Sequence, residues 1–199
     1  MDQAELLLRL VALGVNDLRT PLATLGGFAR TLASADLPEP HASYARTIEE
    51  SGLQIASIVE ELNLLARIVE GRWQPLLAEA SSRELIEEAA ARFEPGRVRV
   101  TGDAGAAVLV DRPPTVRALT ALTRATMRHG ALDEGIEVVV AGPTIVLAPV
   151  EPNARPVLAA EESRDFGAGA AIRIVRALGG ATRLEGDRFE IVLPAAPSR

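Results

Sequence analysis

The chain has 199 residues, of which 48% are hydrophobic and 24% charged, a composition typical of one or two folded domains. Its formal net charge of -6 argues against nucleic acid as a main partner. It has no cysteine and only two histidines, so disulfides, thiolate metal sites and cysteine nucleophiles are excluded. Two histidines alone cannot build a metal cluster, and we expect no bound metal.

The sequence offers no membrane segment. A spanning helix needs roughly 20 consecutive apolar residues, and no run approaches this length. The stretch from Leu6 to Val15 is interrupted by Arg9, and the features of a signal peptide are missing. We therefore expect a soluble, cytoplasmic protein with no membrane partner.

Two long helices are predicted in residues 1–72. Apolar residues recur at alternating intervals of four and three along residues 3–35 and again along residues 41–70, which is a heptad pattern. The first stripe is Ala4, Leu8, Val11, Val15, Leu18, Leu22, Leu25, Ala29 and Leu32; the second is Tyr44, Ile48, Ser51, Ile55, Ile58, Leu62, Leu65 and Val69. Pro21 should kink the first helix, because it removes a backbone donor. A single hairpin cannot bury both stripes, so we expect a homodimer that forms a four-helix bundle.

The rest of the chain is predicted to be a linker over residues 73–80 and an α/β domain over residues 81–199. Ser81 and Glu84 have the spacing of a capping box for a helix that ends near Phe93. Strands are expected at 98–101, 106–110, 136–141, 144–148, 182–185 and 188–193, with helices at 114–128 and 167–178 and a loop after 148. Strands interleaved with helices and closed by a hairpin predict an α/β sandwich.

One motif in the first helix carries a family resemblance. Residues 15–22 read Val-Asn-Asp-Leu-Arg-Thr-Pro-Leu. This run resembles the phosphoacceptor motif of sensor histidine kinases, His-Glu/Asp-Leu-Arg-Thr-Pro-Leu, and residues 64–72 resemble the end of the same family's second helix. The histidine position is taken by Asn16, whose amide nitrogen is delocalised and cannot carry a phosphoryl group as imidazole does. The resemblance implies two-component signalling, and its departure implies no autophosphorylation at this site.

The C-terminal half resembles the ATP-binding domain of the same family, the Bergerat fold shared with gyrase and Hsp90. Residues 167–175 with Gly179 and Gly180 are similar to the family's "GLGLAIVxxxVxxxGG" run, and residues 189–194 to its "FxxxLP" end. The resemblance implies a helical dimerisation domain followed by an ATPase-like α/β sandwich.

The ATP site implied by this resemblance is degenerate. A working site has an Asn that ligates Mg²⁺, an Asp that binds adenine, and a Gly-rich turn beside the phosphates. Residues 118–129 align with the Asn-bearing helix, and Ala125 takes the place of the ligand. The strand at 144–148 runs into a Pro-rich segment with no Asp or Gly. Gly167 and Gly169 are vestigial, since such a turn is equally a tight strand-to-helix connection. We expect no nucleotide or other cofactor.

The residues that remain around the motif imply partner binding. In the family this stretch docks the receiver domain of a response regulator, so Asn16, Asp17, Arg19, Thr20 and Pro21 are the implied contacts. The acid acts as a base, and the residue at the position of Thr20 orients the water that hydrolyses the receiver's aspartyl phosphate. Asp17 and Thr20 are therefore candidate phosphatase residues, although they read equally well as solvated residues beside a kink.

The two histidines are weak candidates for a replacement acceptor. His41 opens a helix in a Pro-rich turn, and His129 ends one, where the helix dipole is sufficient reason for it.

Several functions stay open. The first is a catalytically inactive histidine-kinase-like adaptor that binds a receiver domain or a partner kinase. The second is an ATP-independent phosphatase of a phosphorylated receiver. The others are a phosphotransferase or kinase whose acceptor histidine was replaced by mutation, and a dimeric scaffold with no role in phosphate transfer.

Overall fold

The computed structural model describes the chain except for residues 1–17, 19, 36, 160, 162–163 and 198–199. The chain divides into two compact units, Met1–Trp73 and Gln74–Arg199, which are described separately below. Among the described residues, no helix is both long enough and apolar enough to cross a membrane.

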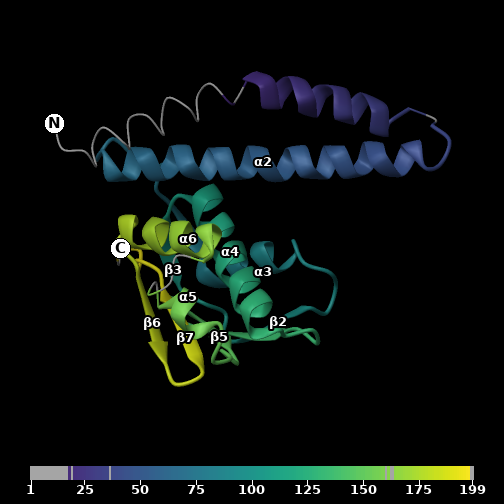
Figure 1. The fold of residues 1–199 in the computed structure, drawn as a ribbon. Helices are drawn as coiled ribbons and strands as arrows, with labels where there is room; N and C mark the ends of the chain where they lie inside the picture. The colour runs from purple at the N-terminus through teal and green to yellow at the C-terminus, as the bar shows by residue number, and fades with distance from the viewer. Residues whose placement is uncertain (1–17, 19, 36, 160, 162–163, 198–199) are drawn as a thin grey trace. The chain divides into compact units, whose positions relative to one another are not determined.

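The first unit is a helical hairpin (Figure 1). Residues 20–33 are helical, and α2 spans His41–Val69. Gly71 ends α2 with a φ of 66°, a left-handed conformation that glycine adopts without steric cost. The predicted second helix is confirmed, whereas the start of the first helix and any kink upstream of Pro21 lie outside the described residues.

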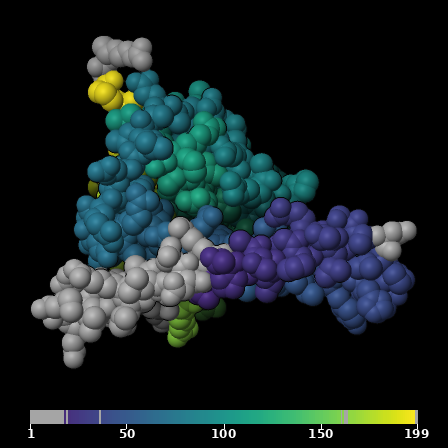
Figure 2. Space-filling model, turned by 90° about the horizontal axis from the view of Figure 1, so that it is seen from above, coloured from purple at the N-terminus to yellow at the C-terminus, as the bar shows by residue number. Residues whose placement is uncertain are grey.

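The two helices pack through a stripe different from the predicted one. Ala45, Gly52, Val59 and Ala66 repeat every seven residues along α2 and are buried. Gly52 and Val59 line a groove that is shared with the first helix, and a Cβ at Gly52 would lie 3.5 Å from Leu25 Cδ2. Figure 2 shows the first helix, in purple, packed along the blue residues of α2. Small residues thus allow the close approach of the two helices.

The predicted heptad stripes are mostly exposed in the single chain. On α2, Tyr44 is 60% exposed and Ile58 40% exposed. The predicted first stripe divides: Ala29 is buried, whereas Leu25 and Leu32 are 45% and 46% exposed. The hairpin therefore presents apolar surface beyond the face that joins its two helices.

The second unit is an α/β domain with a five-stranded and a two-stranded sheet. In the larger sheet the strand order is β2-β4-β5-β7-β6, with β2 and β4 parallel and the other neighbours antiparallel. The elements are β1 Ala78–Ser81, α3 Ser82–Ala90, β2 Val98–Gly102, β3 Ala107–Val110, α4 Arg112–Gly130, β4 Ile136–Ala141, β5 Thr144–Ala148, α5 Arg155–Leu158, α6 Phe166–Ala177, β6 Ala181–Glu185 and β7 Arg188–Val192. Helix α4 packs between α3 and α6 (Figure 1). The predicted order of a helical hairpin followed by an α/β domain is confirmed.

Three local predictions were wrong. The stretch expected to be a linker contains β1, which pairs with β3 in the smaller sheet. The capping box is not formed: Ser81 pairs with Ala107 in that ladder, and its hydroxyl donates to the Ala104 carbonyl instead of capping α3. The predicted loop after β5 contains the short helix α5.

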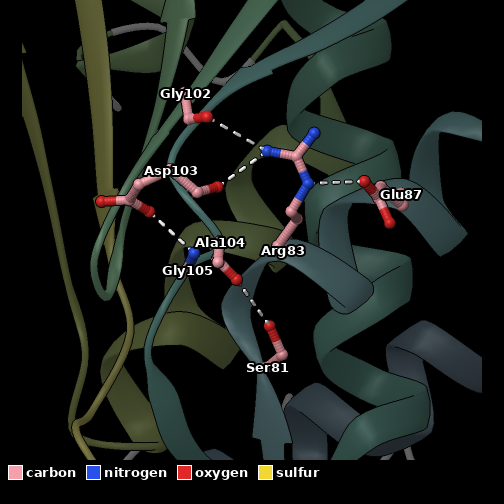
Figure 3. A network of polar contacts seen from close by, with 7 residues as sticks. All are labelled: Ser81, Arg83, Glu87, Gly102, Asp103, Ala104 and Gly105. Carbon is pink, nitrogen blue, oxygen red and sulfur yellow. Dashed lines mark hydrogen bonds and ion pairs between the residues drawn. The ribbon is translucent and has the colours of Figure 1, made fainter.

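A polar network fixes the loop between β2 and β3 (Figure 3). Arg83 donates to the Asp103 carbonyl at 2.7 Å and to Glu87 Oε1 at 2.7 Å. The Asp103 carboxylate accepts from the amides of Gly105 and Gly142 at 2.7 and 2.9 Å. These bonds tie the loop to α3 and to the turn between β4 and β5.

Candidate functional site

The predicted ATP-site helix is α4, and the hydroxyls of its buried threonines bond within the helix. Thr120, Thr123 and Thr126 are buried, and each hydroxyl donates to the carbonyl four residues earlier at 2.8 Å. These back-bonds satisfy the hydroxyl donors inside the helix. The helix therefore packs as an apolar element although its sequence contains several threonines.

The position predicted to carry the Mg²⁺ ligand is a buried methyl group. Ala125 is 1% exposed. One turn earlier lies Ala121, and a Cβ placed on Gly167 of α6 would lie 3.6 Å from the Ala121 Cβ. Asn occurs in the chain only at positions 16, 63 and 153, so α4 has none. Helix α4 packs against α6 here, and it has no carboxamide side chain that could hold a cation.

The segment after β5, where the resemblance implies the adenine contact, joins the core. The Val150 amide donates to the Asp187 carbonyl at 2.7 Å, which ties this segment to the turn between β6 and β7. Ala154, Val157 and Leu158 are buried, and α5 contacts both α4 and α6. Sequence reasoning missed α5, because a four-residue helix offers less than two turns of periodicity.

The most prominent charged cluster of this region joins α4 to α6. Asp165 is the N-cap of α6, and its Oδ1 accepts from the Ala168 amide at 3.0 Å. Its Oδ2 lies 3.0 Å from His129 Nε2 and 3.4 Å from an Arg128 guanidinium nitrogen. Burial alone would raise the pKa of Asp165. The Ala168 amide, His129 and the positive charge of Arg128 outweigh that effect and hold the pKa below 3.8.

Sequence reasoning missed Asp165 but had a signal for it. An Asp just before a helical run is a strong N-cap candidate. His129 was explained by the helix dipole alone, and the structure adds its carboxylate partner. Gly167 lies in the first turn of α6, where an added Cβ would come 3.4 Å from Asp165 Oδ1. Gly169 lies in the same helix, with open space around the position of a Cβ.

The predicted partner-binding residues are only partly described. Asn16, Asp17 and Arg19 lie outside the described residues. Thr20 and Pro21 are exposed on the first helix, and the Thr20 carbonyl accepts from the Thr24 hydroxyl at 3.1 Å. Their roles in receiver binding or phosphatase chemistry stay predictions.

The remaining candidates show no catalytic grouping. His41 is exposed at the start of α2 and meets the Tyr44 ring edge-on, with 6.4 Å between ring centroids. Within the described part of the chain, no three His, Asp or Glu side chains gather in a way that could hold a metal ion.

Residues 7–71 match the family model of the His Kinase A (phospho-acceptor) domain. The helical hairpin is therefore a domain of this phosphoacceptor family. Curated protein sequences contain no match to it.

Solved structures of histidine kinases share the fold of this chain. Full-length ShkA in complex with AMPPNP matches with a TM-score of 0.63 and 21% identity, over 96% of this chain and 47% of ShkA. The histidine kinase AdeS of Acinetobacter baumannii matches with a TM-score of 0.56 and 16% identity, over 91% of this chain and 98% of AdeS. The cytoplasmic segment of histidine kinase QseC matches with a TM-score of 0.52 and 14% identity, over 80% of this chain and 97% of that segment. The chain spans about half the length of the ShkA chain.

Proposed function

We propose that this histidine-kinase-like chain is a non-catalytic adaptor of two-component signalling. As a homodimer, it binds the receiver domain of a response regulator or a partner kinase and changes the flow of phosphate through that pathway. The observation that carries the proposal is Ala125, a buried methyl group on α4 where a kinase of this fold needs a Mg²⁺ ligand.

Two further departures from the kinase pattern support inactivity. Asn16 stands at the acceptor position of the sequence motif. The segment after β5 has no Asp–Gly turn and packs into the core through α5. The three departures lie in different elements, so one substitution does not account for all of them.

The hairpin supports the dimeric and partner-binding parts of the proposal. Leu25 and Leu32 of the first helix and Ile55 and Ile58 of α2 are each 40–46% exposed. Burying such a side chain stabilises an assembly by roughly 1.5–3 kcal/mol, and a second hairpin supplies a matching apolar face. Thr20 belongs to the motif and is exposed, so a receiver domain can reach it.

Calorimetry with a panel of receiver domains tests the adaptor function. Each receiver is titrated in its unphosphorylated and phosphorylated forms, and its acyl phosphate is followed over time in a parallel sample. The adaptor proposal expects a receiver or a kinase to bind while the lifetime of the phosphate is unchanged. Failure to bind any receiver or histidine kinase encoded beside this chain contradicts the proposal.

Calorimetry also tests the proposed loss of ATP binding. We expect no measurable heat of binding for ATP with Mg²⁺, because α4 has no Asn to hold the metal and the segment directly after β5 has no Asp–Gly turn to bind adenine. A dissociation constant in the low micromolar range contradicts the inactivity of the α/β unit.

Exposure of Thr20 favours one second candidate, a receiver phosphatase. A hydroxyl that orients water needs neither the acceptor histidine nor ATP. Faster loss of phosphate from a receiver, abolished by Thr20→Ala and retained by Thr20→Ser, would establish this activity in place of the adaptor.

A further inference from the structure

The N-terminus of α6 is occupied by a side chain of this chain. Helix N-termini attract anions, because their first amides lack partners within the helix and the dipole is positive there. Asp165 supplies the anion: its Oδ1 accepts from the Ala168 amide at 3.0 Å, and only 8% of its side chain is exposed.

The second carboxylate oxygen of Asp165 reaches a different helix. His129 Nε2 lies 3.0 Å from it and an Arg128 guanidinium nitrogen 3.4 Å from it. Both residues belong to the last turn of α4, where the dipole favours cations. One carboxylate thus joins the positive end of α6 to the basic last turn of α4, across 36 residues of sequence.

The space around this junction is narrow. A Cβ on Gly167 would lie 3.4 Å from Asp165 Oδ1 and 3.6 Å from the Ala121 Cβ. Ala125, on the same face of α4, is buried. A phosphate group approaching the end of α6 would first have to displace the carboxylate, which is held at a high effective concentration because it belongs to the same chain.

We propose that Asp165 is an intramolecular clasp that joins α6 to α4 and closes the N-terminus of α6 to anionic ligands. The clasp adds a second reason for the inactivity of the α/β unit besides the missing ligand residues. The N-terminus of α6, which would otherwise bind an anion, is already occupied by the Asp165 carboxylate. The inference deepens the ATP-independence in the proposed function and does not depend on which partner the hairpin binds.

Thermal unfolding of three full-length variants tests the clasp. Asp165→Ala removes the carboxylate, Asp165→Asn keeps a capping oxygen without the charge, and Asp133→Ala removes an exposed acid near the end of α4 as a control. We expect Asp165→Ala to unfold roughly 3–6 °C below the wild type, Asp165→Asn to fall between the two, and the control to match the wild type.

An added anion that restores the stability of Asp165→Ala would distinguish a clasp between two helices from a simple helix cap. Formate and inorganic pyrophosphate, each compared with chloride at equal ionic strength, should raise the unfolding temperature of Asp165→Ala by at least 2 °C more than that of the wild type or Asp133→Ala, roughly half of the expected loss. Adding His129→Gln to Asp165→Ala should abolish this specific gain.

Two results overturn the clasp: equal stability of Asp165→Ala and the control, or the same anion effect in every variant. If Asp165→Ala fails to fold, Asp165→Asn decides, since a clasp predicts that it folds and gains nothing from formate. Micromolar ATP binding by the wild type would instead contradict the proposed function, so the two failures can be told apart.

Discussion

Single residues decide whether the α/β unit keeps a cation and a nucleotide. A carboxamide at position 125 would need room and partners that α4 does not offer, because Ala125 is 1% exposed. Burying an unpaired amide costs roughly 1–3 kcal/mol. Restoring one residue of the family pattern therefore should not restore the chemistry.

Asn16→His tests this expectation directly. The variant should take up no label from radioactive ATP when no other kinase is present, because the phosphoacceptor alone is restored. Electrophoresis after incubation with ATP and Mg²⁺ is the measurement, with an active histidine kinase as the positive control. Labelling of the variant would show that the α/β unit transfers phosphate after all.

The charge of Asp165 gives stability a specific dependence on pH. Its pKa in the folded protein lies below the ordinary 3.8, so the folded state binds this proton more weakly than the unfolded state. The stabilisation is fully present above the ordinary pKa and is lost as the pH falls through the lowered value. The difference in free energy of unfolding between the wild type and Asp165→Asn should thus shrink between about pH 5 and about pH 3.

Urea unfolding at each pH measures this difference, and Asp133→Asn serves as the exposed control. A difference that stays constant or grows toward acid pH would show that the Asp165 charge does not stabilise the fold.

Glycine positions offer a matched pair for backbone strain. Gly102 has a φ of 93°, and a Cβ there would lie 2.1 Å from the Val140 carbonyl oxygen. Gly142 also has a positive φ, 57°, but no atom lies within 4 Å of its Cβ position. Gly102→Ala should therefore cost more than about 2 kcal/mol, and Gly142→Ala about 1 kcal/mol. Equal losses in chemical denaturation would contradict the close approach of β2 and β4.

At the scale of elements, α2 carries two apolar stripes, one buried and one exposed. Its buried stripe of small residues packs with the first helix, and the stripe that contains Ile55 and Ile58 is exposed in the single chain. Replacing Ile55 and Ile58 by Glu should leave the hairpin helical and convert a dimer into monomers, because the charges fall on the exposed stripe alone.

Light scattering after size exclusion measures the mass of this variant, and circular dichroism its helix content. Gln54→Glu, an exposed charge off the stripe, is the control and should stay dimeric. A dimer that survives both isoleucine replacements would mean that another face joins the copies.

Regular elements could be predicted from the sequence, and local contacts between them could not. The heptads of α2 and the runs of β-branched residues in β4 and β5 are local patterns that specify the type of each element. The capping-box prediction failed at Ser81 because this residue is part of a strand. Its backbone pairs with β3, so the spacing to Glu84 does not produce a capping box. The heptad pattern also did not distinguish the stripe inside the hairpin from the exposed one, because both repeat every seven residues.

The candidate site shows the same division. Ala125 at the Mg²⁺ position was predicted from the alignment of a motif, which is local in sequence. The bond between Asp165 and His129 joins residues 36 apart, and no periodic pattern encodes such a pair. The burial of the segment after β5 likewise depends on contacts of α5 with two other helices, α4 and α6.

For the whole molecule, we expect the unfolding of the two units to depend differently on protein concentration. The unfolding temperature of a dimeric hairpin rises with protein concentration, because association stabilises only the folded form. The α/β unit has its own core and should unfold at a temperature independent of concentration.

Circular dichroism follows the helical hairpin, and the destabilising Asp165 variants mark the transition of the α/β unit. A hundredfold range of protein concentration suffices to separate the two behaviours. Two transitions that are both independent of concentration would contradict a dimer held together by the hairpin.

The back-bonded threonines of α4 have a consequence for how such a protein changes over generations. Thr120, Thr123 and Thr126 hide their hydroxyls inside the helix, and Ala125 sits among them with almost no exposed surface. A substitution that put an amide side chain back into this apolar packing would cost stability at once, before a bound metal or nucleotide could offset that cost. Under the proposed loss of nucleotide binding, every single substitution back toward the family pattern would therefore lower the stability of α4 before it restored any binding.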